Sequence, residues 1–334
     1  CPNLPCLRAG LCYKSRMENR VGFMAWVLIG SVWAGLPCSG SPDSSDLAHA
    51  GTSAWPRHTL QADAFWLLNP PDGERFDASG LLLRKNGDLL TVNDRGASLY
   101  RIAFSSHTNE AEMKLLADAF TDRQLAGFAP EKIKRWDCEG LAQDSTHRIY
   151  VCEEANRWIL RLDTQTQQVE RLDIDWSPVR PYFHRTDINA SFEGIAVGKG
   201  KLYVANERQQ GRIIVVHLKS RKVIDHFTVR PSRTRAKDIH YSDLAWHGDS
   251  LFALLRENGV VVQIDPGTRK IIAEYDYRDM ERHPLVAYKN SSLMEGLAVS
   301  DYYFWLVADN NGSGRKANPQ DKRPTLFRCK RPDR

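Results

Sequence analysis

The sequence has 334 residues, of which 42% are hydrophobic, 26% charged and 10% aromatic. This composition excludes collagen, a continuous coiled coil and a wholly disordered chain, and it allows a sizeable core. The 46 lysines and arginines nearly balance the 41 aspartates and glutamates. That balance argues against a dedicated nucleic-acid binder, whose binding face carries a strong basic excess.

The first 50 residues differ from the rest. Residues 17–20 are polar and charged, residues 21–36 are an apolar run, and small polar residues follow. Sixteen apolar residues are few for a membrane-spanning helix, which needs about 20, and the pattern is typical of a secretory signal. We therefore expect a secreted or periplasmic protein, with residues 1–50 as an upstream segment, signal and linker, and residues 51–334 as one domain.

Three processing routes fit this N-terminal segment. Leu36-Pro37-Cys38 is compatible with lipidation of Cys38, which would anchor the protein to a membrane. A plain signal cleaved between Ala34 and Ala50 is the alternative, and an uncleaved membrane anchor is the third.

From residue 79 onward the sequence repeats one pattern five times. Each copy has a two-residue Glu-Gly-like step, an apolar run, a turn, and a second run that ends at a polar residue. The five steps are Ser79-Gly80, Glu139-Gly140, Glu193-Gly194, Ser242-Asp243 and Glu295-Gly296. The polar residues that end the second runs are Asp94, Glu154, Glu207, Arg256 and Asp309. A period near 50 residues with several short strands predicts an all-β fold, the β-propeller, with one repeat per blade.

The turn residues divide each repeat into short strands. After each first strand we expect second strands at residues 89–93, 149–153, 202–206, 251–255 and 304–308. Third strands are expected at residues 97–102, 158–163, 212–218, 260–265 and 325–328. Fourth strands are expected at residues 113–117, 169–174, 222–229 and 271–277.

The last repeat has no fourth strand of its own. We expect residues 60–68 to complete the last blade and so to close the ring without an open edge. This gives five blades, or six if residues 105–135 contain a degenerate one. Cys138 and Cys152 fall on adjacent strands, where they would form a disulfide in an oxidising compartment or remain free buried thiols.

The first strands of a propeller line its channel, so the repeated acids are expected to converge there. Oxygen donors without a repeated His or Cys suit Ca²⁺. The predicted ligands are Glu139, Glu193, Glu295, Asp94 and Asp309. In the alternative interpretation each Glu caps a strand end or hydrogen-bonds the neighbouring blade.

Further residues are candidates for catalysis. Glu154 or Glu207 would be the general base, and Arg256 would offset the negative charge. Residues on loops near the predicted mouth would assist attack on an ester. These loop residues are His184, Arg185, His240, Arg315 and Lys316.

The chain resembles a known family in the motifs Ser79-Gly80-Leu81, Glu139-Gly140-Leu141-Ala142 and Met294-Glu295-Gly296-Leu297-Ala298. Each motif is followed by its own acidic strand end, and together they are similar to the phytase-like propellers, described as having the esterase-like activity of phytase. Over residues 60–330 the resemblance implies a secreted bacterial propeller and a metal-assisted hydrolase. Blade four departs from it, with Ser242-Asp243 at the step and Arg256 where an acid is expected.

These patterns lead to one functional hypothesis and two alternatives. We expect a monomeric extracytoplasmic hydrolase that binds Ca²⁺ and acts on a small phosphate or other ester. The first alternative is a non-catalytic, calcium-stabilised propeller that binds a cell-envelope partner or glycan. The second is a lactonase-type hydrolase. The substrate itself is not encoded in these motifs, because a fold does not fix a function.

Overall fold

The computed structural model describes residues 54–128, 136–208, 211–233, 239–289 and 294–332. All of them belong to the unit Thr52–Arg334, which separates from Cys1–Gly51. The predicted signal segment and Cys38 lie outside the described residues. Within the described ranges, no helix is long and apolar enough to cross a membrane.

Short antiparallel strands dominate this unit. The strands of the first two groups are β3 (Ala78–Leu83), β4 (Leu89–Asn93), β5 (Leu99–Phe104) and β6 (Glu110–Leu115), then β7 (Cys138–Gln143), β8 (Ile149–Glu153), β9 (Trp158–Asp163) and β10 (Gln168–Arg171). Those of the next two are β11 (Phe192–Gly198), β12 (Lys201–Asn206), β13 (Arg212–His217) and β14 (Lys222–Phe227), then β15 (Asp243–His247), β16 (Ser250–Leu255), β17 (Val260–Asp265) and β18 (Lys270–Asp276). Within each group, neighbouring strands pair in chain order.

The fifth group is completed from the N-terminal side of the propeller. It contains β19 (Met294–Val299), β20 (Tyr303–Ala308), β21 (Thr325–Lys330) and β2 (Ala62–Asn69). β2 pairs antiparallel with β21, and its other edge pairs parallel with β6. The predicted closure by an N-terminal strand is therefore confirmed.

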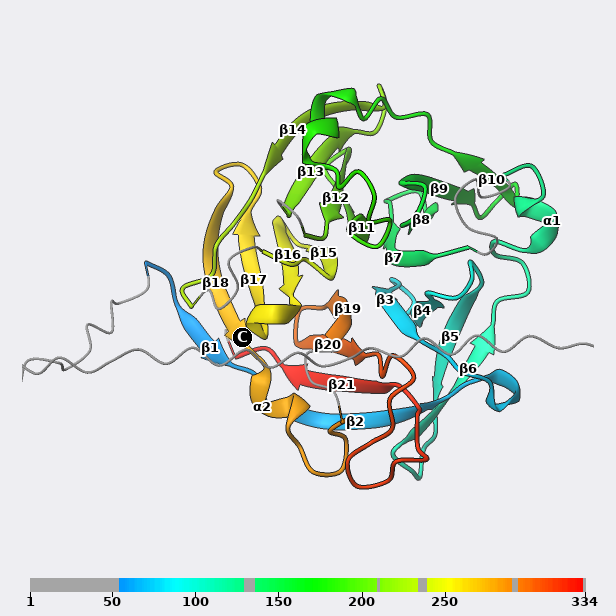
Figure 1. Cartoon of the computed structure of the whole chain (residues 1–334), viewed down its shortest axis with the longest axis vertical. Coiled ribbons are helices and arrows are strands. Elements are labelled where there is room, and N and C mark those ends of the chain that lie inside the picture. Colours follow the sequence, from blue (N-terminus) through cyan, green and yellow to red (C-terminus); the bar gives the residue numbers. More distant parts are fainter. Residues whose placement is uncertain (1–53, 129–135, 209–210, 234–238, 290–293, 333–334) are drawn as a thin grey trace, which may run out of the picture. The chain divides into compact units, whose positions relative to one another are not determined.

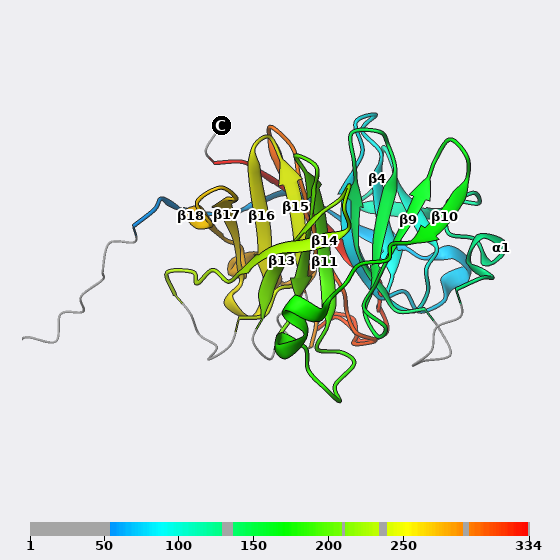
Figure 2. The ribbon, with the colours of Figure 1, turned by 90° about the horizontal axis from the view of Figure 1, so that it is seen from above.

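The first strands of the groups surround a common centre (Figure 1). β3, β7, β11, β15 and β19 contact one another in that order, and β19 contacts β3 again. Seen from the side, the strands run between two rims of loops (Figure 2). The chain is thus a β-propeller, and we interpret each group as one blade.

The remaining elements are short. β1 (Arg57–Thr59) adds a parallel strand outside β18. The helices are η1 (Pro71–Gly73), α1 (Asp122–Leu125), η2 (Ser177–Tyr182), η3 (Arg256–Asn258) and α2 (Arg278–Glu281). In the described part of 105–135, which ends at residue 128, only β6 and α1 are present.

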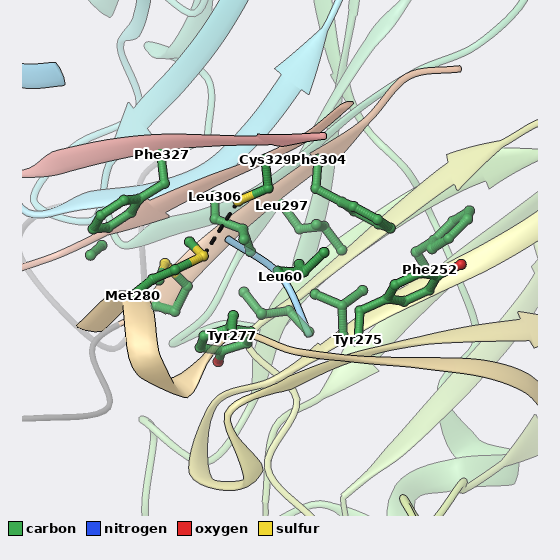
Figure 3. Close-up of a cluster of buried hydrophobic side chains, with 14 of the residues drawn as sticks. Leu60, Phe252, Tyr275, Tyr277, Met280, Leu297, Phe304, Leu306, Phe327 and Cys329 are labelled. Atoms are coloured by element: carbon green, nitrogen blue, oxygen red, sulfur yellow. Dashed lines mark hydrogen bonds between the residues drawn. The ribbon is translucent and has the colours of Figure 1, made fainter. Parts of the chain in front are cut away.

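Apolar side chains fill the spaces between neighbouring blades. Second strands are apolar on both faces because a blade lies on each side of them; all five residues of β8 are buried. Figure 3 shows the cluster between blades four and five, where Leu60 and Met280 join residues of both blades. There Cys329 Sγ donates to Met280 Sδ at 3.3 Å. Among the described residues, the core therefore forms five inter-blade clusters around the ring.

Cys138 and Cys152 are free, buried thiols in the structure. Cys138 is opposite Glu153 in the register, so the two cysteines are not directly paired. Cys152 Sγ accepts the Gly140 N–H at 3.1 Å and lies 3.7 Å from the Phe192 carbonyl oxygen, to which it donates. Of the two possibilities left open by the sequence, the structure has the free thiols.

Candidate functional site

The Glu-Gly step of the repeat is a local irregularity in the sheet. In blades one, two, three and five, the pairing of first and second strands shifts register at the step. In blade four, Asp243 and the residues after it pair with β16 without a shift. A bulge turns the strand and changes the direction of its side chains. The side chain of the first residue of the step, the one before the glycine, is therefore directed toward one rim of the ring.

Glycine at the step allows the first strands to approach closely. A Cβ on Gly140 would lie 2.7 Å from the Cα of Gly194, and a Cβ on Gly194 would lie 2.4 Å from the Cα of Asp243. Both separations are too short for any side chain. We call this level, where the five backbones meet, the waist of the channel.

Asp243 takes the place of glycine in blade four, and its side chain lies within the waist. Its Oδ2 accepts the backbone N–H of Leu297 at 2.8 Å and that of Leu81 at 3.3 Å, and its Oδ1 accepts that of Leu244 at 2.8 Å. Asp243 is completely buried. Burial raises its pKa well above the ordinary value, although these N–H groups act in the opposite direction.

On one side of the waist, carboxylates from several blades are buried together. Glu139 and Glu193 precede their glycines, and Glu154 and Glu207 directly follow the second strands β8 and β12. Backbone bonds fix the latter pair: Glu154 N–H donates to the Asp137 carbonyl oxygen at 2.8 Å, and Glu207 N–H to that of Ser191 at 2.7 Å. The repeat therefore places the two acidic positions of blade two near one another, and likewise those of blade three.

Two groups of these carboxylates are close enough to share a cation. Oxygens of Asp137, Glu139 and Glu154 lie within 4.8 Å of one another, as do oxygens of Glu154, Glu193 and Glu207. Glu154 belongs to both groups. Its Oε1 is buried and has no hydrogen-bond partner among the described residues.

Arg256 changes the balance of charge on the blade-four side. Its guanidinium forms ion pairs with Glu295 and, at 2.9 Å, with Glu207. Arg208 pairs with Glu207 as well, at 2.5 Å. The negative charges of Glu207 and Glu295 are therefore balanced by arginines. Glu139 and Glu154, in contrast, have no ion pair with a described residue.

Burial raises the pKa of most of these groups. The pKa of Glu139 and Glu154 lies well above the ordinary value, because burial and then neighbouring carboxylates disfavour their charged forms. Burial raises the pKa of Glu207 to about 7 even though Arg256 and Arg208 act to lower it. A bound cation would lower these pKa values by favouring the carboxylates.

Asp309 belongs to a second acidic region. Burial, followed by repulsion from Asp77, Glu295 and Asp94, raises its pKa to about 8. Its Oδ2 accepts the Asn311 N–H at 2.8 Å, and its Oδ1 has no hydrogen-bond partner among the described residues. Of the predicted ligands, Asp94 is close enough to act on the pKa of both Asp309 and Glu139, whereas Glu139 groups with Asp137 and Glu154.

The loop candidates differ in their surroundings. His184 Nδ1 accepts the Asp187 N–H at 2.7 Å, within its own loop. His240 Nδ1 lies 3.9 Å from Glu257 Oε1. The placement of Arg315 at the mouth was wrong: this residue is buried, and its guanidinium donates to the carbonyl oxygens of Val286 and Arg323 and to Thr325 Oγ1. It stabilises the connection before β21.

Sequence reasoning missed two acids of the site. Asp137 lies two residues before Glu139, and Asp77 lies two residues before Ser79. The repeated Asp at this offset in blades one and two is the signal that would have found them. Asp243 was noted only as a departure from the repeat, not as a group at the waist.

A family model described as esterase-like activity of phytase matches residues 77–312. No curated protein gives a significant match. Among solved structures, glutaminyl cyclase from Myxococcus xanthus aligns with a TM-score of 0.53 at 14% identity, covering 82% of this chain and 97% of that one. The PQQ-bound aldose sugar dehydrogenase from Streptomyces coelicolor aligns with a TM-score of 0.43 at 12% identity, covering 81% and 98%. The family match spans most of the propeller, and the chain belongs to the phytase-like family.

Proposed function

We propose that this protein is an extracytoplasmic, metal-dependent hydrolase of phosphate or other esters, with Ca²⁺ as its metal. The observation that carries the proposal is the pair of carboxylate groups that share Glu154. A buried carboxylate oxygen without a hydrogen-bond partner is costly unless a cation or proton satisfies it. A donor set made only of oxygen suits Ca²⁺.

The carboxylates best suited to hold the ion are those that form no ion pair with an arginine. Asp137, Glu139 and Glu154 form one compact group, and Glu193 lies in the adjoining one. Glu295 was predicted as a ligand, but its ion pair with Arg256 makes it a weaker candidate. When bound, the metal would supply Lewis-acid stabilisation of negative charge on an ester oxygen.

Glu207 is the preferred candidate for the general base. In the metal-free protein its pKa of about 7 lets it gain and lose a proton near neutral pH, and it lies outside the Asp137, Glu139 and Glu154 group that would hold the ion. Arg208 and Arg256 hold its carboxylate in place. Glu154 is better suited to the metal, and His184 and His240 stay candidates for contacts with substrate at the loops.

One observation favours the non-catalytic alternative. Glu154, Glu193 and Glu207 are all buried, and a structural ion is enclosed, whereas a catalytic ion keeps an open position. In this second candidate function, Ca²⁺ would stabilise the propeller and a loop face would bind an envelope partner or glycan. The extracytoplasmic location belongs to both proposals, with lipidation of Cys38, a cleaved signal and an uncleaved anchor as the three routes to it.

The test combines thermal melting with turnover. The purified chain would be melted with Ca²⁺ and after metal removal, and the same samples assayed on p-nitrophenyl phosphate, p-nitrophenyl acetate and a lactone. Glu154→Gln would be compared with Glu74→Gln, whose side chain is exposed. We expect Ca²⁺ to raise both Tm and ester turnover, and Glu154→Gln alone to abolish both responses.

Each other outcome selects a different interpretation. A Ca²⁺-dependent Tm with no turnover on the panel would favour the binding scaffold. Turnover confined to the lactone would favour the lactonase-type hydrolase. If Ca²⁺ changed neither Tm nor turnover, the metal proposal would be wrong.

A further inference from the structure

A cavity opens on the opposite side of the waist from the carboxylates. It has a volume of about 1040 Å³ and is lined by the first strands, the turns that follow them, Arg161 of β9 and the turn between β13 and β14. Its floor includes Leu81, Leu244 and Leu297, whose backbone N–H groups donate to Asp243 at the waist. We call this cavity the cationic cup.

The lining of the cup is strongly basic. Seven lysines and arginines line it, against two acidic residues, Asp144 and Asp301. The whole chain has 46 basic and 41 acidic residues, so the excess is local. Converging cations at the mouth of a low-dielectric recess raise the local concentration of anions.

The arginines of the cup are held by partners in the same region. Arg148 Nε donates to Asp144 Oδ2 at 2.7 Å. Arg161 and Arg221 both form ion pairs with Glu170, the latter at 2.9 Å. A guanidinium has five N–H donors in a fixed fork, so each is positioned by one carboxylate and retains other donors.

The lysines of the cup stand at the turns. Lys85 and Lys219 form no ion pair with a described residue, and Lys199 pairs with Asp249 at 2.9 Å across an exposed contact. Exposed ion pairs of this kind contribute little to the free energy of folding. These ammonium groups are therefore free to pair with a ligand at small cost.

We propose that the cationic cup binds a small organic anion that carries two or more phosphate or carboxylate groups. The charged groups would pair with the guanidinium and ammonium groups of blades one to three, and the body of the ligand would rest on the leucine floor. The volume matches the upper range of small-molecule sites. The proposal does not depend on the hydrolase assignment, because the waist separates this cavity from the carboxylates.

The experiment uses tripolyphosphate and citrate as probes, one for each kind of acidic group. Binding to the full chain would be measured by titration calorimetry in low-salt buffer treated to remove metals, without a chelator because polycarboxylate chelators would compete. The test variant is Lys85→Ala/Lys199→Ala/Lys219→Ala. The matched control is Lys114→Ala/Lys289→Ala/Lys322→Ala, which removes three exposed lysines that do not line the cup.

We expect at least one probe to bind, with affinity falling as salt rises. The cup variant should bind it at least tenfold more weakly with an unchanged melting curve, and the control variant should bind like the parent. Stronger binding of tripolyphosphate would indicate a phosphorylated ligand, and stronger binding of citrate a polycarboxylate. Absence of binding to both probes, or equal loss in both triple variants, would overturn the proposal.

Discussion

Asp243 Oδ2 accepts the backbone N–H of Leu297 at 2.8 Å and so links β15 to β19. The same carboxylate accepts two further backbone N–H groups at the waist. Asp243→Ala would leave buried donors without acceptors, each costing about 1–3 kcal/mol. We expect a loss of at least 2–3 kcal/mol in the free energy of unfolding, measured by urea denaturation.

Asp249→Ala is the control for this change, because its carboxylate is 83% exposed and forms only a surface pair. It should change stability by less than about 1 kcal/mol. Similar losses in the two variants would show that Asp243 does not hold the waist together.

The metal-free protein should lose stability as the pH rises. The folded state raises the pKa of Glu207 from 4.5 to about 7 and that of Asp309 from 3.8 to about 8. A raised carboxyl pKa favours folding at low pH, and that contribution is lost between the unfolded and the folded pKa. Urea denaturation at pH 5, 6.5 and 8 should show that the free energy of unfolding falls by several kcal/mol as the pH rises. A constant or rising stability would contradict these pKa shifts.

Arg256 should matter most when its partners are ionised. Arg256→Met leaves Glu207 and Glu295 without their shared cation, and breaking a buried pair costs about 3–5 kcal/mol. We expect that loss at pH 8 and a smaller one at pH 5, where protonation removes the uncompensated charge. Arg282→Met, at a side chain that is 68% exposed, is the control. An equal loss at both pH values would mean that packing, not charge, explains the role of Arg256.

The cysteines of the propeller should be chemically inert in the folded protein. Cys138 and Cys152 are fully buried, and burial raises the pKa of both thiols well above the ordinary value, so little thiolate is available. In a chain with the other cysteines outside the propeller replaced by serine, Ellman's reagent should react with the propeller thiols only after denaturation. Rapid labelling of the native chain, or a missing thiol after denaturation, would argue against this arrangement.

Most of the strands follow from local sequence. The second strand predicted at residues 149–153 is β8 with the same ends, and the third strand at 260–265 is β17. These strands are defined by apolar runs between turn residues, which are local signals. The completion of the last blade by β2 was also predictable, because the last repeat lacked a fourth strand and residues 60–68, just before the first repeat, were unassigned.

The site was harder to predict because its key contacts cross between blades. The repeat locates Glu139 and Glu154, but it says nothing of where the long side chain of Arg256 reaches, and that side chain decides which acids are neutralised. At the waist, four blades have a glycine, which has no side chain. The repeat therefore does not indicate where the side chain of Asp243 would point. The roles of the site residues stay predictions until the metal and ester experiments are done.

The position of β2 has a consequence for how the molecule is made. This strand precedes β3 to β20 in the chain, yet its partner β21 follows all of them and is the last of the described strands. Contacts between such distant segments form slowly, because a long loop must close first. Until β21 emerges, blade five lacks its third strand and the ring has an open edge. Ring closure is therefore expected to be the late, slow event of folding, and agents that bind the free edge of β2 would trap the chain before it.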